Sequence, residues 1–161
     1  MGLSVSRVGG SAQRAAIRQI SGQLRVNLAQ YRELAIFMQF GSDLDSETQK
    51  TLSRGAKMSD TLKQRQYLNY TVKEMIVLLV VSQSDLVDKI PEKKMEAYNE
   101  GLLGYIRINK PQLLDEIDPD RKLSDELKGE ILQIADDYIS FSVSEEDGRG
   151  EEAEAPQTEA D

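Results

Sequence analysis

Arg7 is the residue of this sequence best suited to chemistry, because it stands in a serine- and glycine-rich stretch between Ser4 and Gly10. An arginine presents a planar, permanently charged fork of N–H donors that matches two phosphate oxygens at once. At a boundary between subunits, such a side chain can reach a phosphate held by a neighbour. By its residue type alone, however, a single loop arginine is in most chains a solvated surface charge.

Two glutamines in a polar connector could recognise a ligand by hydrogen bonds. Gln64 and Gln66 lie in the segment Lys63–Tyr67, between two stretches with helical patterns. Each carboxamide carries donors and an acceptor, so a pair of them can read the edge of an adenine ring. Glutamines in a connector are more often simply solvated, and the residues alone leave both interpretations open.

No residue set predicts a metal centre or an independent catalytic site. Asp43/Asp45 and Asp136/Asp137 are paired carboxylates, but the chain has no His and no Cys to accompany them. Histidine is the usual general base near neutral pH and the commonest metal ligand. The sequence also contains no Gly-x-x-x-x-Gly-Lys-Ser/Thr phosphate loop. We therefore predict that the chain binds no metal and is inactive by itself.

The negative charge is concentrated at the C-terminal end. Residues 144–161 contain six Glu, two Asp and one Arg, so they carry −7 of the formal net charge of −8. A segment so charged and so poor in apolar side chains cannot offset its ordering entropy, which predicts a disordered acidic tail. The preceding 143 residues are nearly neutral and are enough for one domain with a buried core.

The composition argues against a membrane span and against nucleic acid as a partner. The longest apolar run, Met75–Val81, has seven residues, whereas a membrane-spanning helix needs about twenty. The chain has no basic stripe with interleaved aromatic residues, the pattern typical of nucleic-acid binding. Any membrane association is therefore expected to be indirect.

A long periodic stretch must position the residues around Arg7. Apolar residues recur every three or four positions after Ser11, which predicts one amphipathic helix over Ala12–Phe40, weakened at Gly22. Ser11 is the expected N-cap of this helix. The predicted apolar face consists of Ile17, Ile20, Leu24, Leu28, Tyr31, Leu34 and Met38.

Start signals divide the rest of the chain into five further helices. Ser46 with Gln49, and Thr71 with Glu74, have the spacing of a capping box. Pro91, Pro111 and Ser124 are the other start signals, two as first-turn prolines and one as an N-cap. The predicted helices cover 47–63, 72–84, 91–106, 111–117 and 125–139.

Met75–Val81 is the ambiguous element, since its β-branched residues also suit a buried strand. The preceding cap favours a helix, and a helix that is apolar on all sides belongs at the centre of a bundle. The sequence thus predicts an all-α protein with a bundle of about five to six helices. Its predicted parts are a short N-terminal loop (1–11), the bundle (12–143) and the acidic tail (144–161).

Three motifs carry a family resemblance. They are G-L-S-V-S-R-V-G-G at Gly2–Gly10, L-A-Q-Y-R-E-L-A at Leu28–Ala35 and F-G-S-D-L-D at Phe40–Asp45. In this order they closely resemble the C-terminal third of the α subunit of F-type ATP synthases. The similarity runs without gaps to about Gln66 and is looser beyond it.

The resemblance implies roles for several residues. The family's arginine finger, which acts in trans on the catalytic site of a β subunit, corresponds to Arg7, and Ser4 matches a serine that the family needs for activity. Gln64 and Gln66 match glutamines near the adenine of a non-catalytic nucleotide, ATP or ADP with Mg. The turn Gly41–Asp45 would face the central rotor subunit. The intact protein would then be a subunit of a proton-transporting ATPase.

The resemblance also implies that the chain is incomplete. In the family a β-barrel and a nucleotide-binding domain come first, so residues 1–11 would be the trailing loop of that missing domain. The implied location is peripheral to an energy-transducing membrane, at the cytoplasmic face of a bacterial plasma membrane. One departure is the absence of the proline that commonly follows the family's counterpart of Tyr67. The alternative is a free-standing helical interaction or assembly module without nucleotide chemistry.

Overall fold

The computed structural model describes residues 7–38, 45–63 and 69–151 of the chain, and side chains over 9–37, 45–63 and 69–142. These residues form α-helices and two short 3-10 helices and contain no strand, which confirms the predicted all-α class. Met75–Val81 is therefore helical. The elements are α1 (Arg7–Ala12), α2 (Ala15–Met38), α3 (Ser46–Thr61), α4 (Val72–Ser82), η1 (Asp85–Lys89), η2 (Glu92–Lys94), α5 (Met95–Asn109), α6 (Pro111–Glu116) and α7 (Asp125–Glu151).

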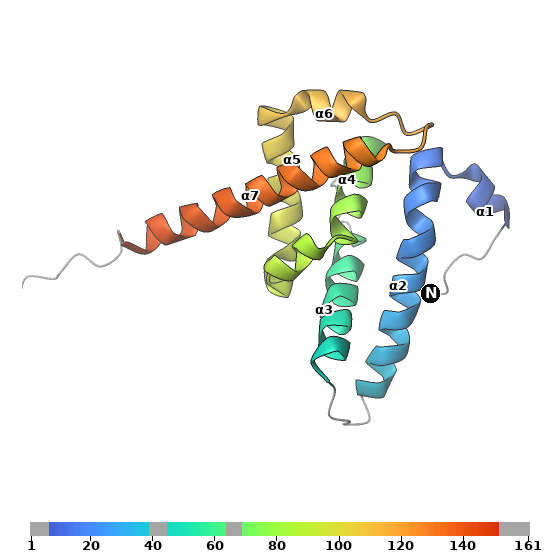
Figure 1. The fold of residues 1–161 in the computed structure, drawn as a ribbon, viewed down its shortest axis with the longest axis horizontal. Coiled ribbons are helices and arrows are strands. Elements are labelled where there is room, and N and C mark those ends of the chain that lie inside the picture. The colour runs from blue at the N-terminus through green and yellow to red at the C-terminus, as the bar shows by residue number, and fades with distance from the viewer. Residues whose placement is uncertain (1–6, 39–44, 64–68, 152–161) are drawn as a thin grey trace, which may run out of the picture.

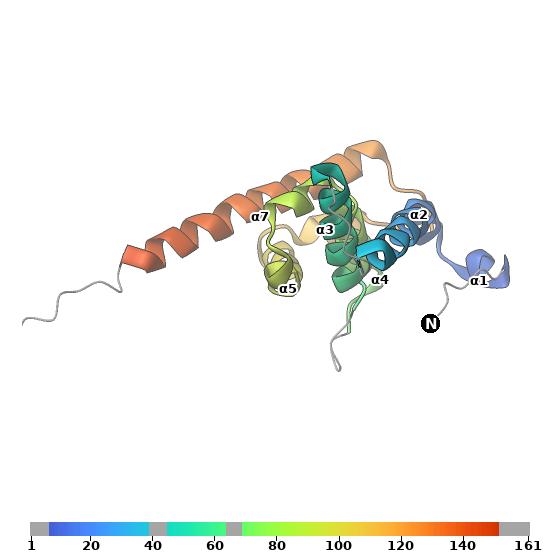
Figure 2. The same cartoon turned by 90° about the horizontal axis from the view of Figure 1, so that it is seen from below.

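The helices pack around α4. Helices α2 and α3 run side by side, and α3 also contacts α4 and α5 (Figure 1). Helix α7 crosses α4 and α5, and its C-terminal part projects beyond the other helices in both views (Figure 2). The short helix α1 lies beside the N-terminal end of α2 (Figure 1).

The main core forms where α2, α4, α5 and α7 meet. Ile76, Leu102, Ile106 and Ile131 are completely buried there, so the predicted central position of the apolar helix α4 is confirmed. Leu24 and Leu28 of α2 form a second cluster with Met58 of α3. The apolar face predicted for α2 accordingly points inward over the part whose side chains are described, Ile17 to Leu34, and the arginines between its members are exposed.

The helix predicted over Ala12–Phe40 is instead two helices, which corrects the prediction at its N-terminal end. Arg7–Ala12, expected as the end of a loop, form α1, and a break at Gln13 and Arg14 separates it from α2. Ser11 lies inside α1 and is not the N-cap of the long helix. Helix α2 continues without interruption through Gly22.

The capping predictions were right at α4 and α7 and wrong at α3, in addition to Ser11 at the long helix. The capping box of Thr71 and Glu74 is formed, and the Ser124 hydroxyl accepts from the amide of Leu127 at 3.1 Å. At α3 the cap is one residue earlier than predicted. The Asp45 carboxylate accepts from the amide of Thr48 at 3.1 Å, so Ser46 is the first residue of the helix.

Two further boundaries differ from the sequence pattern. Pro91 precedes the 3-10 helix η2, and α5 begins only at Met95. Helix α7 runs to Glu151, eight residues past the predicted end of the bundle at 143. Extending an existing helix avoids the cost of nucleation, and this lets α7 continue into polar sequence. For residues 152–161, which lie outside the described residues, disorder stays a prediction.

Candidate functional site

The predicted site residues belong to two separate segments. Arg7 is the first residue of α1, and its side chain is not described. Ser4, Gln64 and Gln66 lie outside the described residues. The structure therefore describes the helices on either side of these residues.

Arg18 joins α1 to α2. From the first turns of α2 its guanidinium reaches back over the break in the chain. Its Nε donates to the Gly10 carbonyl at 3.0 Å, and one terminal nitrogen donates to the carbonyls of Ser11 and Gln13, both at 2.8 Å. The last carbonyls of a helix have no partner within it and carry partial negative charge, so a cation suits this position.

The start of α2 is attached in turn to the loop between α6 and α7. The Ala16 amide, which has no partner within the helix, donates to the Pro119 carbonyl at 3.1 Å. The Gln19 carboxamide pairs with the backbone of Leu123 in both directions, at 2.9 and 3.3 Å. Arg14 and Asp120 add an exposed ion pair at 3.2 Å. The base of α2 is thus held by residues about a hundred positions away in sequence.

Sequence reasoning missed Arg18 and Gln19 as structural residues. The helical pattern assigned Arg18 only to the polar side of the long helix, and it gave Gln19 no role. Arg18 contacts residues that precede it by five, seven and eight positions. On a continuous helix, side chains meet residues three or four positions away, so the helical pattern does not predict these contacts. No local signal in the sequence marks the break at Gln13 and Arg14 that Arg18 spans.

The connector that contains Gln64 and Gln66 is flanked by elements attached to α5. Before it, the Thr61 hydroxyl at the end of α3 accepts from the side-chain nitrogen of Asn99, which belongs to α5, at 3.3 Å. After it, Glu74 caps α4 and also accepts from Arg107 at 2.6 Å. Burial tends to raise the pKa of Glu74, but hydrogen bonds from Thr71 and Arg107 outweigh it and lower this pKa below 4.5. Both flanks are thereby fixed to one helix.

The turn expected to face the rotor lies at the other end of α2. Within the predicted turn Gly41–Asp45, Asp45 alone is described, and it caps α3. The hydrogen bond from Thr48 lowers the pKa of this carboxyl. Since α2 has 24 residues, it spans about 36 Å. About the length of α2 therefore separates Asp45 from α1.

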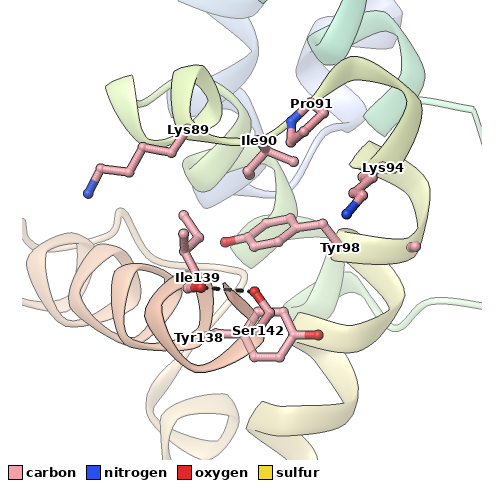
Figure 3. A pocket seen from close by; sticks show the side chains of 9 residues that line it. Lys89, Ile90, Pro91, Lys94, Tyr98, Tyr138, Ile139 and Ser142 are labelled. Carbon is pink, nitrogen blue, oxygen red and sulfur yellow. Dashed lines mark hydrogen bonds between the residues drawn. The ribbon is translucent and has the colours of Figure 1, made fainter. Parts of the chain in front are cut away.

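A cleft at a third place contains none of the predicted site residues. It has a volume of about 320 Å³, and the rings of Tyr98 and Tyr138, with centroids 5.5 Å apart, form part of its wall (Figure 3). The Lys89 ammonium at its rim pairs with Asp136 at 2.5 Å. The full lining comprises Lys89, Ile90, Pro91, Lys94, Ala97, Tyr98, Tyr138, Ile139 and Ser142.

The described ranges contain neither a metal site nor a membrane span. No group of three or more His, Cys, Asp or Glu side chains there is arranged to hold a metal ion. Of the helices described, none combines the length and the apolar character needed to cross a bilayer.

Comparison with known proteins shows the family to which this chain belongs. A family model described as "ATP synthase alpha/beta chain, C terminal domain" matches residues 13–138, so the chain belongs to this family. The match begins directly after α1. The chain is also 40% identical over 145 residues to the ATP synthase subunit alpha of Desulforudis audaxviator (strain MP104C). These residues are 90% of this chain and 29% of that relative, so the chain spans less than a third of the relative's length.

Proposed function

We propose that this chain is the C-terminal domain of the α subunit of a rotary, proton-translocating ATP synthase. The observation that carries the proposal is the 40% identity to an ATP synthase subunit alpha over 90% of the chain. In the assembled enzyme the domain would alternate with β subunits in a ring and contact the central rotor subunit. The complex would make or hydrolyse ATP in coupling to proton transport. It would lie at an energy-transducing membrane, as at the cytoplasmic face of a bacterial plasma membrane.

Arg7 would act as an arginine finger on a nucleotide held by the neighbouring β subunit. As the γ-phosphate is transferred, charge builds up on its oxygens, and a guanidinium in contact with them stabilises the transition state. Ser4, in the same S-V-S-R-V-G-G motif, would shape the loop before Arg7. The attachment of α1 to α2 supports this role, because a finger must be held in place to discriminate the transition state.

Gln64 and Gln66 would contact the adenine of ATP or ADP in a non-catalytic site. Their carboxamides offer the paired donor and acceptor that an adenine edge requires. This part of the chain would help to recognise the base of the nucleotide.

The test of the finger is a substitution in an assembled ring. A chimera would carry this chain in place of the matched 145 residues of the Desulforudis subunit alpha, together with that organism's other ring subunits. Arg7→Ala should lower the rate of ATP hydrolysis by about 10³-fold or more with the ring intact. The control is Arg32→Ala, which removes an exposed arginine of α2 and should leave the rate unchanged.

An unchanged rate in an assembled Arg7→Ala ring would contradict the finger and favour an interaction module without nucleotide chemistry. Failure of the unsubstituted chimera to assemble would count against membership of the α subunit itself. Sedimentation of the ring, measured beside the rate of phosphate release, separates these two outcomes.

A further inference from the structure

The guanidinium of Arg18 is the main described link between α1 and the bundle. It donates to three carbonyls, those of Gly10, Ser11 and Gln13, which surround the break between α1 and α2. A second, weaker connection comes from the Ser21 hydroxyl, which donates to the Gln13 side chain at 3.1 Å. Both connections start from the same side of α2.

Helix α1 needs such a link, because six residues are too few to form a stable helix alone. Its Gly9 and Gly10 weaken it further, each by about 1 kcal/mol relative to alanine. The direction of α1 therefore depends on what holds its C-terminal end. The rigid fork of an arginine can engage several carbonyls in one fixed geometry, which a lysine ammonium on a flexible stem cannot do equally well.

The base of α2 gives Arg18 a firm support. Ala16 and Gln19, on either side of Arg18 in the first turns, are hydrogen-bonded to the backbone of Pro119 and Leu123. These contacts attach the start of α2 to the loop before α7. A path of hydrogen bonds thus runs from the bundle through Arg18 to α1, whose first residue is Arg7.

We propose that Arg18 is a positioning residue for Arg7, holding α1 so that the finger meets the phosphate of the neighbouring subunit. This inference rests on the proposed function of Arg7. A displacement of about 1 Å at a catalytic group can lower a rate by about a hundredfold. Loss of the Arg18 contacts should therefore act on the turnover number, while substrate affinity, which is set elsewhere in the site, should stay nearly unchanged.

The first test measures the link without any catalysis. In the 161-residue chain, NMR Cα shifts of Gly9–Ala12 report whether α1 is helical. Arg18→Ala should move these shifts toward coil values and leave those of α3–α7 unchanged. The control is Arg32→Ala, because Arg32 is also an exposed arginine of α2 but lies farther along the helix from α1. Helical shifts that persist in the Arg18→Ala chain would overturn the inference.

The second test uses the chimeric ring. Arg18→Ala should lower kcat for ATP hydrolysis by about ten- to a hundredfold, with KM changed by less than about twofold. Arg18→Lys, which keeps the charge, should recover part of the rate. In an Arg7→Ala ring, the further change Arg18→Ala should have no effect, because a residue that acts through another shows no separate contribution once its target is gone.

The outcomes distinguish the inference from the function on which it rests. If Arg7→Ala slows the ring but Arg18→Ala does not, the positioning role is wrong and the finger stands. If Arg18→Ala slows the ring by the same factor with or without Arg7→Ala, or prevents assembly, Arg18 has a general structural role and the inference is overturned. If Arg7→Ala itself has no effect, the proposed function fails.

Discussion

Glu74 connects the start of α4 to α5. Its side chain is 4% exposed, closes the capping box of α4 with Thr71, and pairs with Arg107 of α5 at 2.6 Å. A buried carboxylate is costly unless hydrogen bonds replace its water, and here both oxygens have partners. One side chain therefore fixes the start of α4 and its distance to α5.

Glu74→Gln should destabilise the domain by about 1–2 kcal/mol near neutral pH, because neutral hydrogen bonds replace charge-assisted ones. The loss should shrink in acid. The pKa of Glu74 is lowered on folding, so its contribution is complete above the ordinary value of 4.5 and disappears as the pH falls through the folded-state value. Urea unfolding at about pH 7 and about pH 3 measures both effects.

The control for this prediction is Glu116→Gln, which changes an exposed carboxylate in the last turn of α6 and should have almost no effect at either pH. An equal loss of stability for Glu74→Gln at both pH values would contradict an electrostatic role.

Among the elements, α2 and α3 depend on a glycine for their close approach. A Cβ placed on Gly55 of α3 would lie 2.4–2.6 Å from the Cβ, Cγ and Cδ2 atoms of Tyr31 on α2. The Cβ of Tyr31 is bonded directly to the backbone, so no change of rotamer moves it out of the way. Only a residue without a side chain permits this helix pair to pack as it does.

Gly55→Ala should therefore lower the free energy of unfolding by about 1–2 kcal/mol, because overpacking outweighs the gain in helix propensity. Gly22→Ala is the matched comparison. Its added Cβ would meet no atom within 4 Å, so this substitution should stabilise α2 by about 0.5–1 kcal/mol. Urea unfolding of both variants checks the opposite signs, and stabilisation by Gly55→Ala would refute the packing argument.

At the scale of the whole molecule, the domain separates its proposed contact regions. Helix α1 with Arg7 lies at one end of α2 and the start of α3 lies near its other end, and the connector that contains Gln64 is flanked by α3 and α4 (Figure 1). A rigid bundle between these regions would let one domain meet a catalytic site and a rotor at the same time. ATP hydrolysis would then require the partner subunits.

The isolated chain should accordingly show no ATP hydrolysis and little affinity for nucleotide. An arginine finger lowers a barrier only for a phosphate that another group holds, and this sequence has no phosphate loop of its own. Phosphate release and calorimetric titration of ATP with Mg measure the two quantities. Hydrolysis that follows the purified chain through gel filtration and is lost in Arg7→Ala would contradict this expectation.

Much of the fold could be predicted from local sequence alone. The capping box of Thr71 and Glu74, the Ser124 cap and the apolar face of α2 from Ile17 to Leu34 rest on spacings of three or four residues, and the structure has them as expected. Such features can be predicted from the sequence because their interacting residues lie within one helical turn. The motifs around Arg7 also indicated the family, which the match over residues 13–138 confirms.

Only the tertiary structure decided where α1 ends and how it is held. The break at Gln13 and Arg14 depends on Arg18 reaching back across it, and on an α2 base attached to Pro119 and Leu123. The need for Gly55 is likewise set by a ring on another helix. By itself, then, the sequence determined the helices and the family. The tertiary structure decided the joints between helices, because their energies come from partners that local spacing does not specify.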